Sequence, residues 1–381
     1  MIRLRSLKLM SGVSTLAVLA TFGAVDPVLA AGTTVSGPGN VGAIDTSTLP
    51  NQDFVTINGD ANVAAGGSGS FYNPSTETIN NAAGTGLQID DSVLQGTVTN
   101  AGELLGSTDG MNADDTILHG IVNSGTIDGA AGNGIELDEV VLSGGISNTA
   151  TGTISGTVTG INLTDSGTFS GGINNAGLIL STAGEGIYIE DDWSFSGGIN
   201  NSGTIEAATS GIDIDADSFS GGITNSGLIT TSTSTGIYWT GDSFAGGINN
   251  TATGTINADT GYGIYLGGGI FTNGITNAGL INAPGNYGIY IDADQVQGGI
   301  NNSGSISASI TALYFDGELF QGGVTNSGVI ESLNNLGLNL VSGEFQGGIN
   351  NAATGTISSL STGIYVSNDT FTGGITNAGL I

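Results

Sequence analysis

The sequence predicts an all-β protein that folds as a parallel β-solenoid, a rod in which the chain winds through stacked coils. Three observations predict this fold: a repeat of about 25 residues, alternation of apolar and polar residues within each copy, and no helical 3.6-residue pattern beyond residue 30. We expect about twelve coils, wound right-handed because parallel crossover connections almost always have that hand.

The first 30 residues have the pattern of a secretory signal peptide. The whole chain has only three basic side chains, which are Arg3, Arg5 and Lys8. An apolar run follows them to about residue 25, and Val28 and Ala30 occupy the −3 and −1 positions of a small-residue cleavage site. We therefore predict an exported protein whose mature chain begins after Ala30.

The charge of the chain excludes several classes of function. The 381 residues carry 33 acidic side chains and a formal net charge of −30, and removal of the leader would leave no Lys or Arg. Such a polyanion cannot neutralise phosphates, so we expect no nucleic-acid partner, and anionic membranes would repel it. No later apolar run reaches the roughly 18 residues that a membrane helix needs. The chain also lacks cysteine, so no disulfide stabilises it.

Two regions follow the leader. Residues 31–83 are irregular and contain most of the prolines, and we predict that they form an N-terminal cap. Residues 84–381 form the repeat array. One Asn marks each of its twelve copies: Asn100, Asn123, Asn148, Asn175, Asn201, Asn225, Asn250, Asn277, Asn302, Asn326, Asn351 and Asn377.

Within a copy, apolar residues alternate with Ser, Thr and Gly, as in "SFSGGINNSGTI" at residues 194–205. This alternation predicts strand structure with one buried side, and a second short strand is expected at phrases such as "GIYI". Stacking the coils converts each sequence position into a ladder. One ladder would consist of Phe169, Phe195, Phe219, Phe244, Phe271, Val296, Phe320, Phe345 and Phe371.

The repeated Asn has the parity of the buried residues. A buried amide is tolerated only when it is hydrogen-bonded, so we predict a ladder of stacked Asn amides at a coil corner. The paired glycines predict positive φ angles or close backbone packing. Three copies read "NTATG" or "NAATG" where others read "NSG" or "NAG", and this two-residue insertion lengthens a corner without turning the next strand inside out.

These features resemble the passenger regions of bacterial autotransporters, the type V secretion proteins. The resemblance covers about residues 84–381 and rests on the cysteine-free, Gly/Ser/Thr/Asn-rich phrases "GGITNSGLI" and "GGINNSGTI". It implies a β-helical stalk or adhesin held at the outer membrane of a Gram-negative bacterium by a C-terminal β-barrel. Because residue 381 falls inside a repeat, we expect the sequence to be part of a longer protein.

A column of tyrosines is the best candidate for a ligand-binding surface. Its members occupy the middle of the "GIYI" strands and should point outward: Tyr188, Tyr238, Tyr265, Tyr290, Tyr314 and Tyr365. Such a stripe could bind an extracellular glycan or a surface protein. The alternative is that the phenol rings stack on one another and hold the coils in register.

Acidic corners are the second candidate. Asp215 and Asp217, and likewise Asp292 and Asp294, follow the "I-D-x-D" pattern and could bind Ca²⁺ weakly, although the spacing matches neither an EF-hand loop nor the "GGxGxD" nonapeptide. Solvated corner acids are the alternative, and a catalytic carboxylate pair is a further one. His119 is the only histidine, and no nucleophile motif accompanies it.

These observations favour a non-catalytic function. We expect a structural or adhesive rod at the cell surface that presents a binding face, without a cofactor. The alternative is a carbohydrate-active enzyme, or its stalk, with the catalytic part beyond residue 381.

Overall fold

The structure is a computed structural model. It describes residues 5–6, 17–18, 33–36, 44–45, 55–58, 71–73, 75, 78–90, 93–165, 167–190, 193–341 and 343–381. Two short strands, β1 (Arg5–Ser6) and β2 (Ala17–Val18), pair antiparallel, and the rest of the predicted signal peptide lies outside the described residues.

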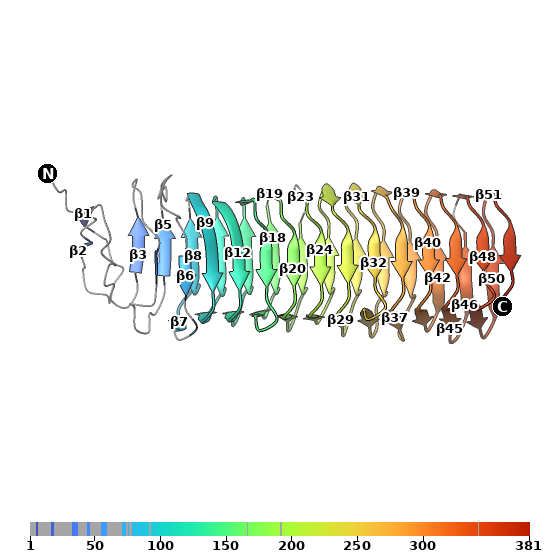
Figure 1. Cartoon of the computed structure of the whole chain (residues 1–381), viewed down its shortest axis with the longest axis horizontal. Helices are drawn as coiled ribbons and strands as arrows, with labels where there is room; N and C mark the ends of the chain where they lie inside the picture. Colours follow the sequence, from blue (N-terminus) through green and yellow to red (C-terminus); the bar gives the residue numbers. More distant parts are fainter. Residues whose placement is uncertain are drawn as a thin grey trace.

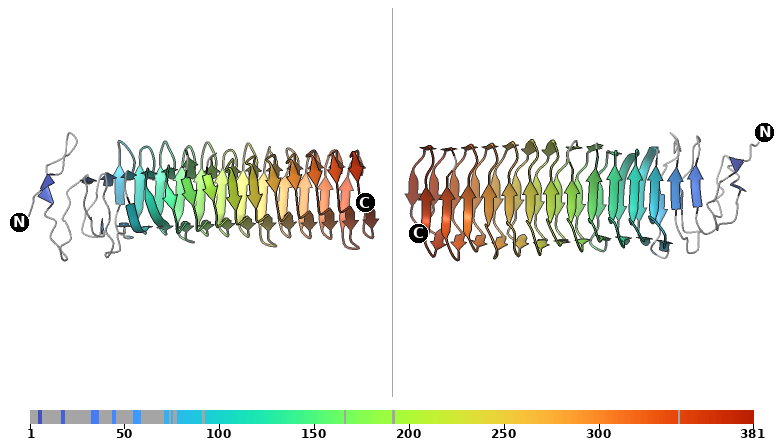
Figure 2. Two further views of the ribbon diagram at one scale, coloured as in Figure 1. Left: turned by 90° about the horizontal axis from the view of Figure 1, so that it is seen from above. Right: turned by 180° about the vertical axis from the view of Figure 1, so that it is seen from behind.

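The predicted β-solenoid is confirmed. Stacked coils form a rod, and the same stacking is seen from the side, from above and from behind (Figures 1 and 2). The described residues form no helix, so none is present that could cross a membrane. Each coil contributes strands to three parallel sheets, in which like positions of successive repeats pair.

The first sheet has twelve strands in the described residues. They are β7 (Thr78–Asn81), β10 (Glu103–Gly106), β13 (Thr126–Gly129), β17 (Thr153–Gly156), β21 (Leu178–Ser181), β25 (Thr204–Ala207), β29 (Leu228–Thr231), β33 (Thr255–Ala258), β37 (Leu280–Ala283), β41 (Ser305–Ala308), β45 (Val329–Ser332) and β49 (Thr356–Ser359).

The second sheet has fourteen described strands and carries the predicted tyrosine column. They are β3 (Thr33–Ser36), β5 (Val55–Asn58), β8 (Leu87–Asp90), β11 (Met111–Asp114), β14 (Ile135–Asp138), β18 (Ile161–Thr164), β22 (Ile187–Ile189), β26 (Ile212–Ile214), β30 (Ile237–Trp239), β34 (Ile264–Leu266), β38 (Ile289–Ile291), β42 (Thr311–Phe315), β46 (Leu336–Leu340) and β50 (Thr362–Val366).

In the third sheet most coils contribute two short strands. They are β4 (Ile44–Asp45), β6 (Phe71–Asn73), β9 (Val93–Asn100), β12 (Ile117–Asn123), β15 (Val141–Leu142), β16 (Ile146–Asn148), β19 (Gly167–Phe169), β20 (Ile173–Asn175), β23 (Trp193–Phe195), β24 (Ile199–Asn201), β27 (Ser218–Ser220), β28 (Ile223–Asn225), β31 (Ser243–Ala245), β32 (Ile248–Asn250), β35 (Ile270–Phe271), β36 (Ile275–Asn277), β39 (Gln295–Val296), β40 (Ile300–Asn302), β43 (Leu319–Phe320), β44 (Val324–Asn326), β47 (Glu344–Phe345), β48 (Ile349–Asn351), β51 (Thr370–Phe371) and β52 (Ile375–Asn377).

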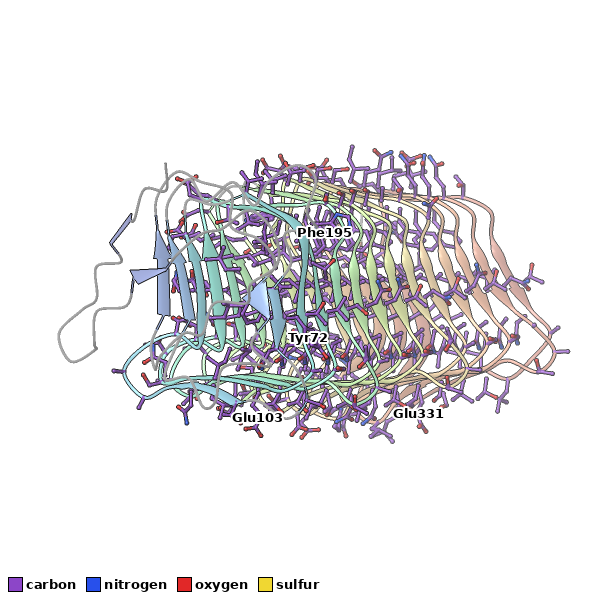
Figure 3. The ribbon with its side chains drawn as sticks, turned by 60° about the vertical axis from the view of Figure 1, so that its left-hand side comes forward. Tyr72, Glu103, Phe195 and Glu331 are labelled. Atoms are coloured by element: carbon purple, nitrogen blue, oxygen red, sulfur yellow. The ribbon has the colours of Figure 1, made fainter. Side chains whose placement is uncertain are left out.

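The interior is filled by the predicted apolar ladders. Phe195 is 1% exposed, and its ring stacks between those of Phe169 and Phe219, with centroids 4.5 and 4.9 Å away. Burial of each such side chain contributes on the order of 1.5–3 kcal/mol. Figure 3 shows that side chains form rows along the rod, so that Glu103 and Glu331, far apart in the sequence, lie on the same side.

The predicted Asn ladder is also confirmed. Asn201 is 1% exposed; its Nδ2 donates to Asn225 Oδ1 (2.8 Å) and to the Leu228 carbonyl (3.0 Å), and its Oδ1 accepts from Asn175 Nδ2. Amide-to-amide bonds of 2.8–2.9 Å continue from Asn73 to Asn377. Because each interior amide both donates and accepts, its burial leaves no unpaired polar group.

The alternation alone predicts that the repeated phrase forms one continuous strand. In the structure the phrase is instead divided into two strands. A corner at Gly197–Gly198 separates β23 from β24, and both glycines have positive φ (102° and 70°). A Cβ at Gly198 would lie 2.6 Å from the Gly221 carbonyl oxygen of the next coil. The paired glycines therefore provide both the left-handed turn and the close packing that the sequence predicts.

The two-residue insertions lie at a corner and leave the next strand in register. Residues 148–152 contain the first insertion, and after it Thr153 and Ile154 pair with Thr126 and Ile127 of the preceding coil. The inward side of the strand therefore stays inward, as predicted.

Candidate functional site

The predicted tyrosine column lies on the outward side of the fourteen-stranded sheet. Tyr265 in β34 is representative: its neighbours Ile264 and Leu266 point inward and are 0% exposed, while Tyr265 is partly exposed on the outer face. The strand alternation therefore positions each ring, because two buried residues fix the orientation of the residue between them.

Four of the six predicted tyrosines form a continuous stack along the rod. The centroid distances are 4.8 Å from Tyr238 to Tyr265, 5.4 Å from Tyr265 to Tyr290 and 4.8 Å from Tyr290 to Tyr314. The interplanar angles are only 5–10°. The stacking that was one interpretation of this column is thus present, and each pair contributes about 0.5–1.5 kcal/mol beyond area burial.

The other two predicted tyrosines lie outside this stack. Asp213 takes the place of a tyrosine between Tyr188 and Tyr238, and Asn339 does so between Tyr314 and Tyr365. Tyr365 is 47% exposed.

Two tyrosines that the sequence analysis missed widen the stack. Tyr262 and Tyr287 stack on each other at 5.7 Å, and Tyr262 lies 5.4 Å from the ring of Tyr265. Tyr287 likewise lies 5.5 Å from Tyr290. The available signal was the residue before the glycine in "GYGIYL" and "GNYGIYI", which is Thr or Ser in neighbouring coils.

We name these six side chains the tyrosine patch: Tyr238, Tyr262, Tyr265, Tyr287, Tyr290 and Tyr314. Carboxylates lie along one side of the patch. The Tyr290 hydroxyl donates to Asp316 Oδ2 at 3.4 Å. Desolvation raises the pKa of Tyr265 to about 12, and the negative charge of Asp292 contributes to the same shift. The Tyr265 phenol therefore remains a protonated hydrogen-bond donor at physiological pH.

The same column is polar in the N-terminal coils. It contains Gln88, Asn112, Glu136 and Asn162, and Gln88 Nε2 donates to Asn112 Oδ1 at 2.7 Å. Asn162 Nδ2 donates to Glu136 at 3.1 Å. These coils pair in the same register as those of the tyrosine patch, so the coils do not need tyrosine at this position to stack on one another.

Several carboxyl groups on this sheet have raised pKa values. Burial raises the pKa of Asp213 to about 7, and the charges of Asp215 and Glu185 add to the shift. Desolvation also raises the pKa of Asp138 to about 7, together with its hydrogen bond to Asp165. Each group is therefore partly protonated near neutral pH.

The structure places the predicted calcium ligands at corners after β26 and β38. Asp215 accepts a hydrogen bond from the Thr240 hydroxyl, whereas Asp217 and Asp294 are exposed. Desolvation raises the pKa of Asp292, and the charges of Asp316 and Asp294 raise it further. In the described ranges, no three His, Cys, Asp or Glu side chains are grouped closely enough to hold a metal ion, and calcium binding stays a prediction.

His119 lies on the third sheet, away from the tyrosine column. Its Nδ1 is 3.2 Å from the Oγ of Ser143 in the next coil, at an exposed position.

The fold and the patch together define a class: an elongated parallel β-solenoid with an aromatic stripe on one outer face. The chain matches no protein-family model, and no curated protein or solved structure is significantly similar to it. The geometry and the sequence are therefore the basis of the functional proposals below.

Proposed function

We propose that this protein is an exported, non-catalytic rod that presents a binding surface outside the cell, and that the tyrosine patch is that surface. One observation carries the proposal. The outward column changes from Gln, Asn and Glu to Tyr along the rod, while the Asn ladder and the strand register inside remain the same. Six partly exposed aromatic rings gathered on one face are typical of an interaction surface.

The sequence supports export. The three basic residues, the apolar run and the small residues at 28 and 30 have the order of a signal peptide. The resemblance to autotransporter passengers adds display at the outer membrane, through a barrel that would follow residue 381. A rod with a continuous hydrogen-bonded interior suits a spacer that holds a binding face away from the cell.

Expression of the full chain in a Gram-negative host tests the export. We expect cleavage after Ala30, so mass spectrometry of the extracytoplasmic fraction should give a chain that starts at Ala31. An intact chain that still begins with Met1 and stays in the cytoplasm would overturn the proposal.

Attachment of protein-coated beads tests the binding face. Beads carrying the mature protein should attach to cultured epithelial cells or to cells of the producing host. A variant with Tyr262, Tyr265, Tyr287 and Tyr290 each replaced by Asn, the residue of the N-terminal coils, should lose this attachment. The matched control replaces four exposed residues of the third sheet with Ala: Asn249, Thr276, Asn301 and Thr325. Equal attachment of both variants would exclude the patch as the binding face.

A further inference from the structure

The tyrosine patch contains more rings than coil stacking requires. The N-terminal coils keep their register with amides and a carboxylate in the same column, as described above. In the patch, Tyr262 and Tyr287 add a second column beside the first, with Tyr262 also 5.4 Å from Tyr290. A second aromatic column on an outer face has no packing role in the core, because it lies outside the closed coil.

The geometry of the stack limits how a ligand can contact it. The rings of Tyr265 and Tyr290 are sandwiched between nearly parallel neighbours, so their faces are covered by other phenols. Stacking on a ligand and cation–π contacts both need an open ring face. Ring edges and hydroxyl groups remain for the ligand, which favours a partner recognised by hydrogen bonds.

Gly267 shows how the rings are oriented. A Cβ at this position would lie 2.5 Å from the Tyr265 hydroxyl oxygen, so the ring extends along the strand and covers residue 267. This orientation directs the hydroxyl toward the column where Asp292 and Asp316 stand in the next two coils. Phenol donors and carboxylate acceptors therefore lie side by side along the patch.

The charge of the chain narrows the class of ligand further. No Lys or Arg follows Lys8. Asp292 and Asp316 lie beside the patch, and the Tyr290 hydroxyl donates to Asp316. A polyanion such as a polyuronate would be repelled. An uncharged ligand with many hydroxyl groups can both accept from the phenols and donate to the carboxylates.

The spacing of the patch suggests a polymer. Its main column repeats once per coil, at the strand spacing of about 4.8 Å, over four successive coils. A β-1,4-linked pyranose unit in an extended chain is slightly longer than one coil is high. We propose that the tyrosine patch binds an uncharged, extended β-1,4-linked polysaccharide that runs along the rod axis with one sugar unit per coil.

This inference rests on the proposed function, because it names the ligand of the same face. The test is isothermal titration of the whole mature protein with cellohexaose, an oligosaccharide long enough to span the four coils. We expect saturable binding by the natural protein. Replacement of both Tyr262 and Tyr287 by Asn should weaken it by at least about tenfold, or about 1.4 kcal/mol. The matched control, Thr276→Ala with Asn301→Ala in the same coils, should bind as the natural protein does.

A second variant separates binding from folding. Gly267→Ala should displace the ring of Tyr265 without removing a tyrosine, and it should weaken cellohexaose binding while leaving the circular dichroism spectrum of the rod unchanged. Maltohexaose, which is curved, and a polyuronate oligomer should bind at least about tenfold more weakly than cellohexaose.

Two outcomes would overturn the inference. One is cellohexaose binding that survives both variants, and the other is no binding by the natural protein. If beads still attach to cells through the tyrosines while cellohexaose neither binds nor competes, the polysaccharide is wrong and the proposed surface stands, with a protein partner. If the chain is not exported, the proposed function fails whatever the titration gives.

Discussion

The N-terminal and C-terminal coils of the rod have the same interior and different outer faces. Asn123 and Asn250 make equivalent amide-to-amide bonds of 2.9 and 2.8 Å to the next coil. On the outer face of the fourteen-stranded sheet, however, the column changes from Asn112 and Glu136 to Tyr265 and Tyr290. Coil stacking constrains the inside and leaves this outer column free, so its side chains report on function more directly than those of the core.

The interior Asn ladder should contribute equally to the stability of both regions. Removing one of its amides should cause the largest loss in the free energy of unfolding. Asn250→Ala removes a donor to Asn277, Gly254 and Leu280 and an acceptor for Asn225. Because these partners are buried, we expect the local free energy of unfolding to fall by about 3 kcal/mol. Hydrogen exchange of the backbone amides in these coils, followed by mass spectrometry, measures this loss.

Two further variants compare this loss of stability between the two regions and between a buried and an exposed position. Asn123→Ala should cost a similar amount in the N-terminal coils. Asn249→Ala changes the exposed neighbour in the same strand and should cost less than about 0.5 kcal/mol. A loss at Asn250 no greater than at Asn249 would show that the amide ladder does not stabilise the rod.

The border between the two regions should respond to pH. Asp213 has a pKa of about 7 in the folded chain, against about 3.9 when unfolded. Between these values the folded chain holds a proton that the unfolded chain has lost, so stability falls as pH rises from about 4 to 7. We expect Asp213→Asn to remove on the order of 1–2 kcal/mol of this dependence.

Thermal melts at pH 5 and pH 8 measure the effect. The melting temperature of the natural protein should be higher at pH 5, and the difference should shrink in the variant. Asp138, also with a raised pKa, acts in the same direction and should leave part of the slope in place. An unchanged slope in Asp213→Asn would show that the carboxyl ionises as freely as in the unfolded chain.

The tyrosines should matter less for folding than the interior amides. Tyr265→Asn introduces the residue that the N-terminal coils have at Asn112 and Asn162. It removes stacking on Tyr238 and Tyr290, and we expect a loss of about 1–2 kcal/mol with the solenoid intact. Chemical denaturation and far-ultraviolet circular dichroism measure both quantities. Loss of the fold would mean that the patch is a structural element of the C-terminal coils.

The fold could be predicted in detail because coil stacking makes each sequence column a physical ladder. The Phe and Asn columns could therefore be predicted from a single sequence. The corner at Gly197–Gly198 could be predicted only in part. The glycines indicate positive φ, but the alternation of apolar and polar residues continues across them in the sequence and does not indicate a corner. Gly197 is exposed and Gly198 is buried, which reverses the parity that the sequence predicts.

Of the candidate site, only the main column of tyrosines could be predicted from the sequence. The outward direction of Tyr238 or Tyr290 follows from its position between two buried residues. Tyr262 and Tyr287 follow no alternation, because they precede the strands, and their packing against the column depends on how the chain enters each strand. The packing of the Tyr265 ring over Gly267 could not be predicted either, because strand alternation does not specify the direction in which the ring extends.

Completing the tyrosine column should have the smallest effect on the free energy of unfolding, and it should stabilise the rod rather than destabilise it. Asn339 interrupts the stack between Tyr314 and Tyr365, and its buried Oδ1 has no hydrogen-bond partner. Asn339→Tyr removes this unpaired acceptor and adds ring contacts to both neighbours, so we expect a gain of about 0.5–1.5 kcal/mol in chemical denaturation. Asn162 Oδ1 is also buried without a hydrogen-bond partner, so the matched change Asn162→Tyr removes the same kind of unpaired acceptor. It has only one tyrosine neighbour, Tyr188, and breaks the bond to Glu136, so it should stabilise the rod less than Asn339→Tyr does. If both changes stabilise the rod equally, any aromatic side chain is favourable on this face, and the contrast between the two regions has no energetic basis in stacking.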